Sequence, residues 1–297
     1  MSFAENLYAL YPDQAKDWLA ALPAFLKSTS AKLAIQIAAP FSNLTYHYVA
    51  PATSADGEAL VFKCGIPNKA MQTEVAALQH YDGVGCVRLL KSDVEQGWLL
   101  MGACQPGIPL SAEENDELAT HTAVQVMQKL WKPIASQSDF PSITDWLQGL
   151  HRMKTDSRAQ ALIPRCLSDF AFHTAQDLQV SLGEPILLHG DLHHDNILSS
   201  KRESYLAIDP KGILGEAEYE VGALARNPID KIGKISALPR FLKRRLDQLA
   251  AETGFDRQRI LQWSIVQAVL AAYWQIEDDC SDGRRWIHCA EALYESN

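Results

Sequence analysis

Hydrophobic and polar positions in the first part of the chain alternate between helical and extended patterns. In residues 1–30, apolar side chains recur at intervals of three and four, which predicts a helical extension. Residues 33–49 have a strand-like pattern that is interrupted by a polar loop at 40–45. The dipeptide Asp56-Gly57, between apolar segments, predicts a tight hairpin turn. The chain is therefore expected to begin with helices and to continue into a β-hairpin.

A strand with a charged end is expected after this turn. The run 59–63 is apolar until Lys63, and the next segment has helical spacing with Glu74 beside its apolar positions. Residues 87–90 and 98–101 are two further short apolar runs, which predict strands. This order of elements, a strand with a lysine, a helix with a glutamate and more strands, predicts a small mixed α and β unit.

The pattern changes after the tripeptide Gln105-Pro106-Gly107, which predicts a hinge. A capping box of Ser111 and Glu114 then predicts the start of a helix that runs toward Pro133. Helical periodicity returns in the later segments 139–153, 164–182, 217–225, 238–253 and 256–279. The sequence therefore predicts an α+β fold with a smaller N-terminal lobe, 1–103, and a larger, mainly helical C-terminal lobe, 104–297.

Charge and composition disfavour several classes of protein. The 297 residues carry a net charge of -9, with a pI near 5.5. Nucleic-acid binding needs clustered positive charge, so we expect no nucleic-acid partner, whereas a cationic small molecule suits this charge. The longest apolar stretch, 260–274, contains polar residues and is too short to span a bilayer, so we expect no membrane partner. Six cysteines without a CxxC pair, and an N-terminal segment unlike a secretion signal, predict a reduced cytoplasmic protein.

A polar loop between two apolar runs contains the residues most suited to chemistry. Residues 189–196 read His-Gly-Asp-Leu-His-His-Asp-Asn and follow the apolar run 185–188. Another apolar run, 205–208, is closed by Asp209. Acids and an amide at the ends of short strands are costly to bury without partners, so the pattern predicts a bound cation.

Phosphoryl transfer is the reaction that this set of residues suits. It requires positioning and charge neutralisation more than covalent help from the protein. Asp191 is expected to orient an acceptor hydroxyl and to accept its proton, while Asn196 and Asp209 supply the oxygen ligands that Mg²⁺ prefers. Lys63 and Glu74 are expected to form an ion pair that holds the phosphates of ATP.

Two motifs, which occur in order, resemble those of a known family. Residues 189–196 resemble the catalytic loop of the aminoglycoside phosphotransferase group of protein-kinase-like small-molecule kinases, and residues 208–212, Ile-Asp-Pro-Lys-Gly, resemble its metal-binding segment. The second segment, the Asn227-Pro228 pair and Glu277-Asp278 after Trp274 are similar to the branch that contains streptomycin 6-kinases and hydroxyurea phosphotransferases.

This resemblance implies a two-lobed, protein-kinase-like fold with the nucleotide bound by the N-terminal lobe. It also implies an ATP- and Mg²⁺-dependent transfer of the γ-phosphoryl group to a hydroxyl of a small molecule. The acceptor that it implies is a cationic aminoglycoside such as streptomycin, or hydroxyurea.

The chain departs from the family pattern at three places. Ser42 and Asn43 occupy the nucleotide loop where the family usually has a glycine, and their backbone N–H groups are expected to meet phosphate. The strand before the hinge ends at Gly102 instead of the usual glutamate, and backbone groups around Gly102 and Cys104 are expected to meet adenine. Glu220 replaces the usual aspartate, which puts the bracing of the catalytic loop in question.

The acids Glu277 and Asp278 have two interpretations. Carboxylates at the C-terminal end of a helix are mildly unfavourable, so either nearby arginines (Arg284 and Arg285) or a cationic ligand should offset their charge. Local pairing is the simpler explanation, whereas the resemblance favours Glu277 and Asp278 as acceptor-binding residues.

Other polar residues have plainer explanations. The basic residues within 240–245 are interpreted as the solvated side of an amphipathic helix. His189 is expected to be structural, His193 and His194 have no assigned role, and a zinc site is disfavoured because the loop lacks a helical H-E-x-x-H context. Two alternatives stay open: a metabolic kinase of the same fold, acting on choline, homoserine, a thiosugar or a fructosamine, and a catalytically silent nucleotide-binding module.

Overall fold

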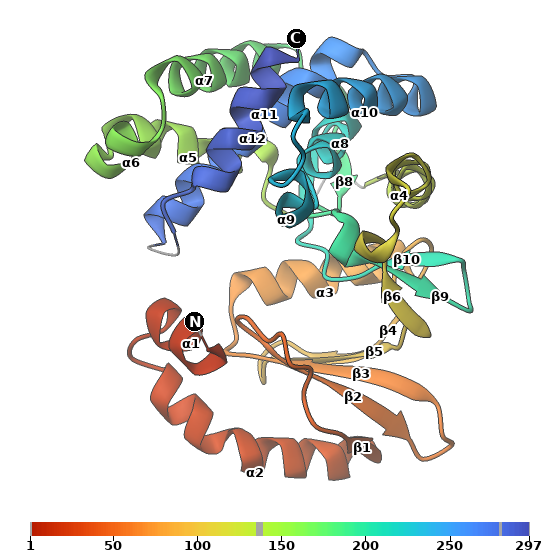
Figure 1. Ribbon diagram of the computed structural model, residues 1–297. Coiled ribbons are helices and arrows are strands. Elements are labelled where there is room, and N and C mark those ends of the chain that lie inside the picture. Colours follow the sequence, from red (N-terminus) through yellow and green to blue (C-terminus); the bar gives the residue numbers. More distant parts are fainter. Residues whose placement is uncertain (1, 135–138, 279–280, 297) are drawn as a thin grey trace. The chain divides into compact units, whose positions relative to one another are not determined.

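The computed structural model describes residues 2–134, 139–278 and 281–296 and divides the chain into two compact units, 1–107 and 108–297. The first unit contains an antiparallel sheet with helices, and the second is mainly helical (Figure 1). The predicted α+β class, with a smaller strand-rich part and a larger helical part, is confirmed.

Two helices precede the sheet of the first unit. Helix α1 (Phe3–Leu10) starts with a capping box in which Ser2 and Glu5 accept each other's backbone N–H groups. Helix α2 (Ala15–Leu33) is longer and ends at Ala34, which has a left-handed backbone conformation.

Helix α2 continues through Pro23, although the apolar stripe in the sequence is interrupted there. Packing explains this continuity, since helical stability in proteins comes mostly from burying an apolar face. The side chains of α2 that pack against the sheet lie on both sides of the proline: Trp18, Leu22, Phe25, Leu26 and Leu33.

The sheet is antiparallel, with the strand order β1-β2-β3-β5-β4. Its strands are β1 (Ile35–Ile37), β2 (Tyr48–Ser54), β3 (Ala59–Cys64), β4 (Leu89–Asp93) and β5 (Trp98–Gly102). The predicted hairpin joins β2 to β3, and Gly57 has φ +85°, a conformation that glycine adopts without a steric penalty. In the core, the rings of Phe62 and Trp98 are stacked with their centroids 6.1 Å apart. Helix α3 (Lys69–Tyr81) follows β3 and is capped by Asn68.

Helices form most of the second unit (Figure 1). They are α4 (Asp116–Leu130), α5 (Ile143–Thr155), α6 (Ser157–Leu162), α7 (Arg165–Val180), α8 (Ala217–Ala225), α9 (Ile229–Ile232), α10 (Leu238–Thr253), α11 (Arg257–Glu277) and α12 (Arg284–Glu295). Helix α11 is buried on most of its circumference because α5, α7, α8, α10 and α12 pack around it. Among the described residues, no helix is both long enough and apolar enough to cross a bilayer.

Short strands and 3-10 turns make up the rest of the regular structure. The strands are β6 (Pro106–Pro109), β7 (Lys132–Pro133), β8 (Ile186–Leu188), β9 (Ile197–Ser200), β10 (Tyr205–Ala207) and β11 (Ile213–Gly215). They form two small sheets, with the orders β10-β9-β6 and β11-β8-β7. The 3-10 segments are Leu110–Ala112 and His194–Asn196. The apolar runs 185–188 and 205–208, on either side of the polar loop, thus correspond to strands β8 and β10.

The predicted start of α4 is wrong. Helix α4 begins at Asp116, where Asn115 accepts the backbone N–H groups of Glu117 and Leu118, and not at a capping box formed by Ser111. Ser111 lies in a 3-10 turn, and its hydroxyl donates to the carboxylate of Asp195 instead. Because the Ser111 hydroxyl binds Asp195, which is distant in the sequence, it does not form the predicted capping box.

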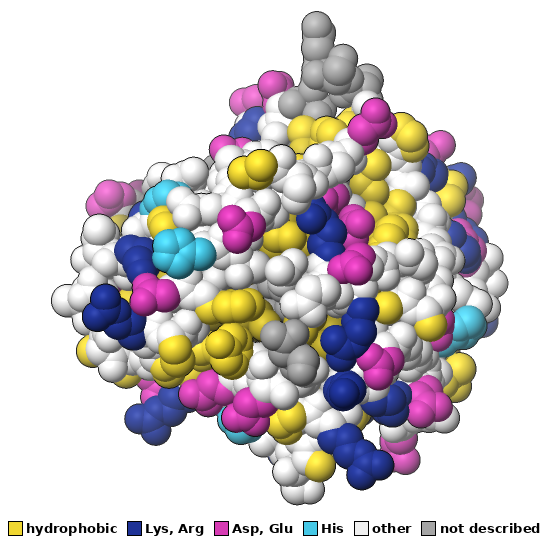
Figure 2. All heavy atoms as spheres, turned by 90° about the horizontal axis from the view of Figure 1, so that it is seen from above, with side chains coloured by type: hydrophobic (Ala, Val, Ile, Leu, Met, Phe, Trp, Pro, Cys, Tyr) yellow, Lys and Arg dark blue, Asp and Glu magenta, His cyan; other side chains and the backbone are white. Residues whose placement is uncertain are grey.

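The outer face of the molecule carries charges of both signs. Figure 2, a view from above, shows Lys and Arg side chains interspersed with Asp and Glu side chains and with hydrophobic groups. On this face the charge is mixed, which differs from the continuous basic surface that is typical of nucleic-acid-binding proteins.

Candidate active site

Lys63 and Glu74 form a buried ion pair in the first unit. Lys63 lies near the end of β3, between Val49 of β2 and Leu99 of β5, and Glu74 lies on α3. The Lys63 Nζ is 2.8 Å from each carboxylate oxygen of Glu74, and the two residues are 5% and 4% exposed. Such a pair holds its ammonium in one place, because either charge alone would be costly to bury.

The other positions expected to contact the nucleotide also lie in the first unit. Ser42 is exposed, in a turn between β1 and β2. Gly102 ends β5, and its backbone N–H already donates to the carbonyl of Arg88 at 3.0 Å. Cys104 is partly exposed just beyond the strand. The Gly102 N–H is therefore engaged within the protein, which leaves its carbonyl as the backbone group suited to meeting adenine.

The second residue of the polar loop is a glycine that no larger residue could replace without rearrangement. Gly190 follows β8 and has φ +85°. A Cβ atom at this position would lie 2.8 Å from Ile213 Cγ2 and 3.2 Å from the ring of Trp146. The tight turn at Gly190 places Asp191 close to the end of the buried strand β8.

His189 has the structural role that was expected for it. Its Nε2 donates to the carbonyl of Ile208 at 2.8 Å, and its Nδ1 accepts the backbone N–H of Asp191 at 3.2 Å. Burial lowers the pKa of His189 to about 4, so the ring is neutral near pH 7 and both hydrogen bonds are compatible with one tautomer. This histidine joins the polar loop to the segment before Asp209.

Glu220 braces the same loop. Its carboxylate accepts the backbone N–H groups of His189 at 2.6 Å and of Gly190 at 3.1 Å, from the first turns of α8. Glu220 is fully buried, and burial raises its pKa to about 7, although the backbone N–H groups work in the opposite direction. The bracing that the glutamate put in question is therefore present.

Asn196, the last residue of the loop, connects Asp191 with the segment before Asp209. The Nδ2 of Asn196 donates to the carbonyl of Asp191 at 2.9 Å, and the carbonyl of Asn196 accepts the N–H of Ile208 at 2.9 Å. Asp209 follows with φ +60°, and its carboxylate lies 2.5 Å from the Lys211 Nζ. The strand pair β9–β10 thus brings the three predicted residues Asp191, Asn196 and Asp209 to one loop cluster.

This donor set fits a magnesium ion. The amide nitrogen of Asn196 is engaged, so its oxygen is the atom left for a ligand, and Asp209 supplies a partly exposed carboxylate. Within the described ranges, no cluster of three or more His, Cys, Asp or Glu side chains could hold a metal on its own. Mg²⁺ typically takes only one or two protein oxygens and completes its shell with water and phosphate oxygens, as this arrangement allows.

A pocket of about 220 Å³ lies beside Asp191, entirely within the second unit. Its lining residues come from the polar loop, from the segment 226–230 that follows α8, and from α12: Asp191, His193, Asp195, Arg226, Asn227, Pro228, Ile229, Asp230 and Trp286. The sequence alone gave no role to Arg226 or Trp286. Arg226 directly precedes the Asn227-Pro228 pair, so that motif was the available signal.

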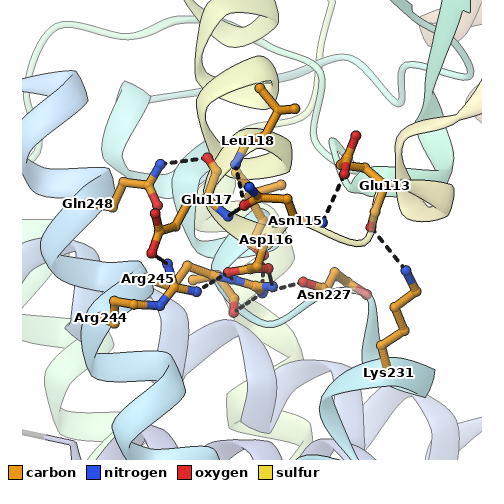
Figure 3. A network of polar contacts seen from close by, with 12 residues as sticks. Glu113, Asn115, Asp116, Glu117, Leu118, Asn227, Lys231, Arg244, Arg245 and Gln248 are labelled. Carbon is orange, nitrogen blue, oxygen red and sulfur yellow. Dashed lines mark hydrogen bonds and ion pairs between the residues drawn. The ribbon is translucent and has the colours of Figure 1, made fainter.

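The interpretation of residues 240–245 as a solvated face is wrong for Arg245. Arg245 is 1% exposed, and its guanidinium donates to the Asp116 carboxylate and to the carbonyl of Ala225 at 3.1 Å (Figure 3). Although burial alone would raise it, the hydrogen bonds from Arg245 and Arg244 hold the pKa of Asp116 below its usual range. The signal was present in the sequence, since Arg245 lies at helical spacing from Leu242 and Leu249 on the apolar face.

Glu277 and Asp278 lie at the exposed C-terminal end of α11. Glu277 accepts hydrogen bonds from Arg152 Nε at 2.6 Å and Nη2 at 3.0 Å, and from the Tyr273 hydroxyl at 2.9 Å. The two arginines considered as local partners bind other acids, since Arg284 pairs with Asp282 and Arg285 with Asp230. Neither Glu277 nor Asp278 is among the described residues that line the 220 Å³ pocket.

The remaining two histidines of the loop differ in environment. The Nδ1 of His193 accepts the N–H of Asp195 and caps the 3-10 turn that leads to Asn196. His194 is 1% exposed, and neither ring nitrogen has a hydrogen-bond partner in the described part of the chain. Burial lowers the pKa of His194 to about 3, so the ring is neutral. Neither environment resembles a zinc site.

Comparison with known proteins identifies relatives along most of the chain. A family model described as aminoglycoside/hydroxyurea antibiotic resistance kinase matches residues 34–279. A streptomycin 6-kinase of Streptomyces glaucescens is 26% identical over 90% of this chain and 87% of its own. A hydroxyurea phosphotransferase of Kitasatospora aureofaciens is 28% identical over 94% and 80%, and a streptomycin 3''-kinase of Klebsiella pneumoniae is 30% identical over 79% and 87%.

Solved structures share the fold at low sequence identity. A thermostable mutant of aminoglycoside phosphotransferase APH(4)-Ia, in a ternary complex with ADP and hygromycin B, has a TM-score of 0.63 at 14% identity, over 91% of this chain and 98% of that one. Choline kinase LicA from Streptococcus pneumoniae has a TM-score of 0.63 at 12% identity, over 93% and 99%. At these identities the likeness supports the fold alone.

Proposed function

The chain belongs to the aminoglycoside/hydroxyurea antibiotic resistance kinase family and is a kinase that acts on small molecules, and we propose that it transfers the γ-phosphoryl group of ATP to an acceptor hydroxyl in a Mg²⁺-dependent reaction. The observation that carries this proposal is the meeting of Asp191, Asn196 and Asp209 in one braced loop cluster beside a pocket. These are the residue types that phosphoryl transfer requires.

In the proposed reaction, Asp191 orients the acceptor hydroxyl and receives its proton. The acceptor oxygen forms a bond to the γ-phosphorus of ATP, and the bond between that phosphorus and the β–γ bridging oxygen breaks. The electron pair of the broken bond stays on ADP, and the products are ADP and the phosphorylated acceptor. Glu220 and His189 contribute by fixing the backbone on both sides of Asp191.

Asn196 and Asp209 are proposed to hold the metal through the amide oxygen and the carboxylate. Bound there, Mg²⁺ would neutralise charge on the phosphate oxygens of the nucleotide. The Lys211 Nζ lies 2.5 Å from the Asp209 carboxylate and balances the negative charge of that carboxylate within the protein. Lys211 would therefore have to share the carboxylate with the ion. Asn196 is fixed by its hydrogen bond to the Asp191 carbonyl, so its oxygen needs no reorientation before it binds.

The first unit is proposed to bind the nucleotide, as residues 1–103 were expected to do, and residues 104–297 to hold the catalytic and acceptor-binding groups. Lys63, held by Glu74, would contact the phosphates that are not transferred. Ser42 would offer a backbone N–H to phosphate, and Gly102 and Cys104 would meet adenine through the backbone. All described cysteines are free thiols, which suits a cytoplasmic enzyme with access to ATP.

A cationic or uncharged acceptor fits the pocket better than an anionic one. Three aspartates line it, Asp191, Asp195 and Asp230, against one arginine. The named activities of the relatives, on streptomycin and on hydroxyurea, supply candidates of both kinds. Glu277 and Asp278 remain proposed contacts for a cation outside the pocket, where an acceptor would compete with Arg152 for Glu277.

An acceptor panel tests the proposal. The full chain is incubated with ATP and Mg²⁺ and with streptomycin, hydroxyurea or choline in turn, and products are identified by phosphorus NMR. A new phosphate-ester resonance with one acceptor supports the proposal and selects between an antibiotic and a metabolite, as choline is the substrate class of one structural neighbour. If no acceptor stimulates ATP consumption and no phosphorylated product forms, a catalytically silent nucleotide-binding module is favoured.

A further inference from the structure

One side chain in the pocket beside Asp191 lacks the partners that its chemistry requires. Arg226 is 8% exposed, and its buried Nε has no hydrogen-bond partner among residues 2–134, 139–278 and 281–296. The guanidinium carbon lies 4.8 Å from the centroid of the Trp286 ring, which is a cation–π contact. An arginine stacked on an aromatic face keeps its N–H donors in the plane of the guanidinium, where a ligand can accept from them.

Other buried arginine and glutamate side chains in this unit are matched within the protein. Arg245 donates to Asp116 and to backbone carbonyls, and Glu216 accepts from Arg259 at 2.6 and 2.7 Å. A buried charged group without hydrogen bonds is costly, so these pairings are what burial normally requires. Arg226 differs because it lines a pocket, where a bound molecule can accept a hydrogen bond from the guanidinium.

The backbone around Arg226 is fixed from two sides. Helix α8 carries Glu220, which braces the catalytic loop, and ends at Ala225, directly before Arg226. Arg245 Nη1 donates to the carbonyls of Ala225 and Asn227, the residues on either side of Arg226, and Figure 3 shows Asn227 joined to Arg245, which also binds Asp116. The same helix therefore sets the positions of Asp191 and Arg226 along the wall of the pocket.

We propose that Arg226 is an acceptor-binding residue, whose guanidinium donates to an uncharged oxygen of the acceptor while the hydroxyl to be phosphorylated lies at Asp191. This inference rests on the proposed function. The ligand class is a small, oxygen-rich molecule, uncharged or cationic, with a hydroxyl, ether or carbonyl oxygen beside the reacting hydroxyl. An anionic group would satisfy Arg226 as well, but Asp191 and Asp195 in the same pocket would repel it.

The test compares Arg226→Met and Arg226→Lys with the full-length wild type. The kcat and KM for streptomycin and for hydroxyurea are measured at saturating ATP and Mg²⁺, together with ATP consumption in the absence of acceptor and the thermal midpoint. We expect Arg226→Met to raise the KM of the acceptor by about tenfold to a hundredfold, as the loss of a hydrogen bond to a charged group implies. Arg226→Lys keeps the positive charge but loses the planar guanidinium, so the KM of the acceptor should rise less than in Arg226→Met. Arg240→Met, on the exposed side of α10, is the matched control and should leave both constants unchanged.

The outcomes separate the inference from the function on which it rests. If the wild type forms no phosphorylated product, the proposed function fails and this inference fails with it. If the wild type is active and both Arg226 variants keep the wild-type KM for the acceptor, the inference alone is overturned. A fall in kcat at unchanged KM also overturns it, because the guanidinium would then act on the transferred group. Should Arg226→Met not fold, Arg226→Lys and a calorimetric titration with streptomycin in the absence of nucleotide decide the matter.

Discussion

The side-chain amide of Asn196 donates a hydrogen bond over 2.9 Å to the backbone carbonyl of Asp191. An amide that gives its nitrogen to one partner presents its oxygen on the other side, where a cation can be bound. The backbone carbonyl of Asn196 also holds the N–H of Ile208, directly before Asp209. One asparagine therefore connects the loop of the proposed base with the segment of the proposed metal ligand.

Asn196→Ala should raise the Mg²⁺ concentration for half-maximal activity by at least about tenfold, because it removes one proposed ligand and the amide that orders the loop. Activity measured against Mg²⁺ at fixed ATP checks this. Asn196→Asp is the informative second variant, since it keeps an oxygen ligand but lacks the N–H donor. It should retain Mg²⁺ affinity and lose kcat. An unchanged Mg²⁺ profile in Asn196→Ala would exclude this residue from the metal site.

Lys63→Met and Glu74→Gln should each destabilise the first unit by about 3–5 kcal/mol, because each removes one charge of a buried ion pair. The double variant should cost clearly less than the sum of the two single variants. Urea unfolding of all three proteins gives these free energies. Additive costs would mean that the two side chains do not stabilise each other.

Glu220→Gln should flatten the dependence of stability on pH. Burial raises the pKa of Glu220 to about 7 from its ordinary value of 4.5, so the folded protein holds this proton at pH values where the unfolded chain has lost it. The contribution to stability is complete below pH 4.5 and is lost as the pH rises toward 7. The loss is at most about 3.5 kcal/mol, since one pH unit between the two pKa values corresponds to about 1.4 kcal/mol.

Urea unfolding at pH 5 and pH 8 measures this difference in the wild type and in Glu220→Gln. Glu114→Gln, at an exposed position of the same unit, should keep the wild-type pH dependence. Equal pH dependence in the wild type and in Glu220→Gln would show that another group titrates in this range.

Much of the site could be predicted from local sequence. The polar loop 189–196 and the run closed by Asp209 each combine an apolar strand with the residues that follow it, so their chemistry is visible within a few positions. The same is true of Lys63 at the end of β3 and Glu74 on the next helix, whose ion pair the structure contains. Local patterns succeed here because strand ends and helix faces are set by nearby residues.

Contacts between distant parts of the chain could not be predicted in this way. Arg226 and Trp286 stack although they lie on opposite sides of α9, α10 and α11 in the sequence. Ser111 was expected to cap a helix and instead binds Asp195, 84 positions away. In each case the partner is set by tertiary packing, and the sequence near either residue does not identify that partner.

Arg245→Met should destabilise the second unit by about 3–5 kcal/mol, because it leaves the carboxylate of Asp116 and the carbonyl at Ala225 without their buried donor. Arg244→Met is the matched control on the same helix. The Arg244 side chain is 37% exposed, so its pair with Asp116 should contribute no more than about 1 kcal/mol. Urea unfolding compares the two, and equal costs would contradict the buried role of Arg245.

The central claim is that Asp191 is the base of a phosphoryl transfer to a small-molecule hydroxyl. Asp191→Asn keeps the size of the side chain and removes its ability to accept the proton. We measure the rate of product formation with the best acceptor of the panel by phosphorus NMR, and the affinity for ATP by calorimetry. The account predicts that kcat falls by about 10² to 10⁴-fold while ATP affinity is unchanged. An Asp191→Asn protein that turns over at the wild-type rate would contradict it.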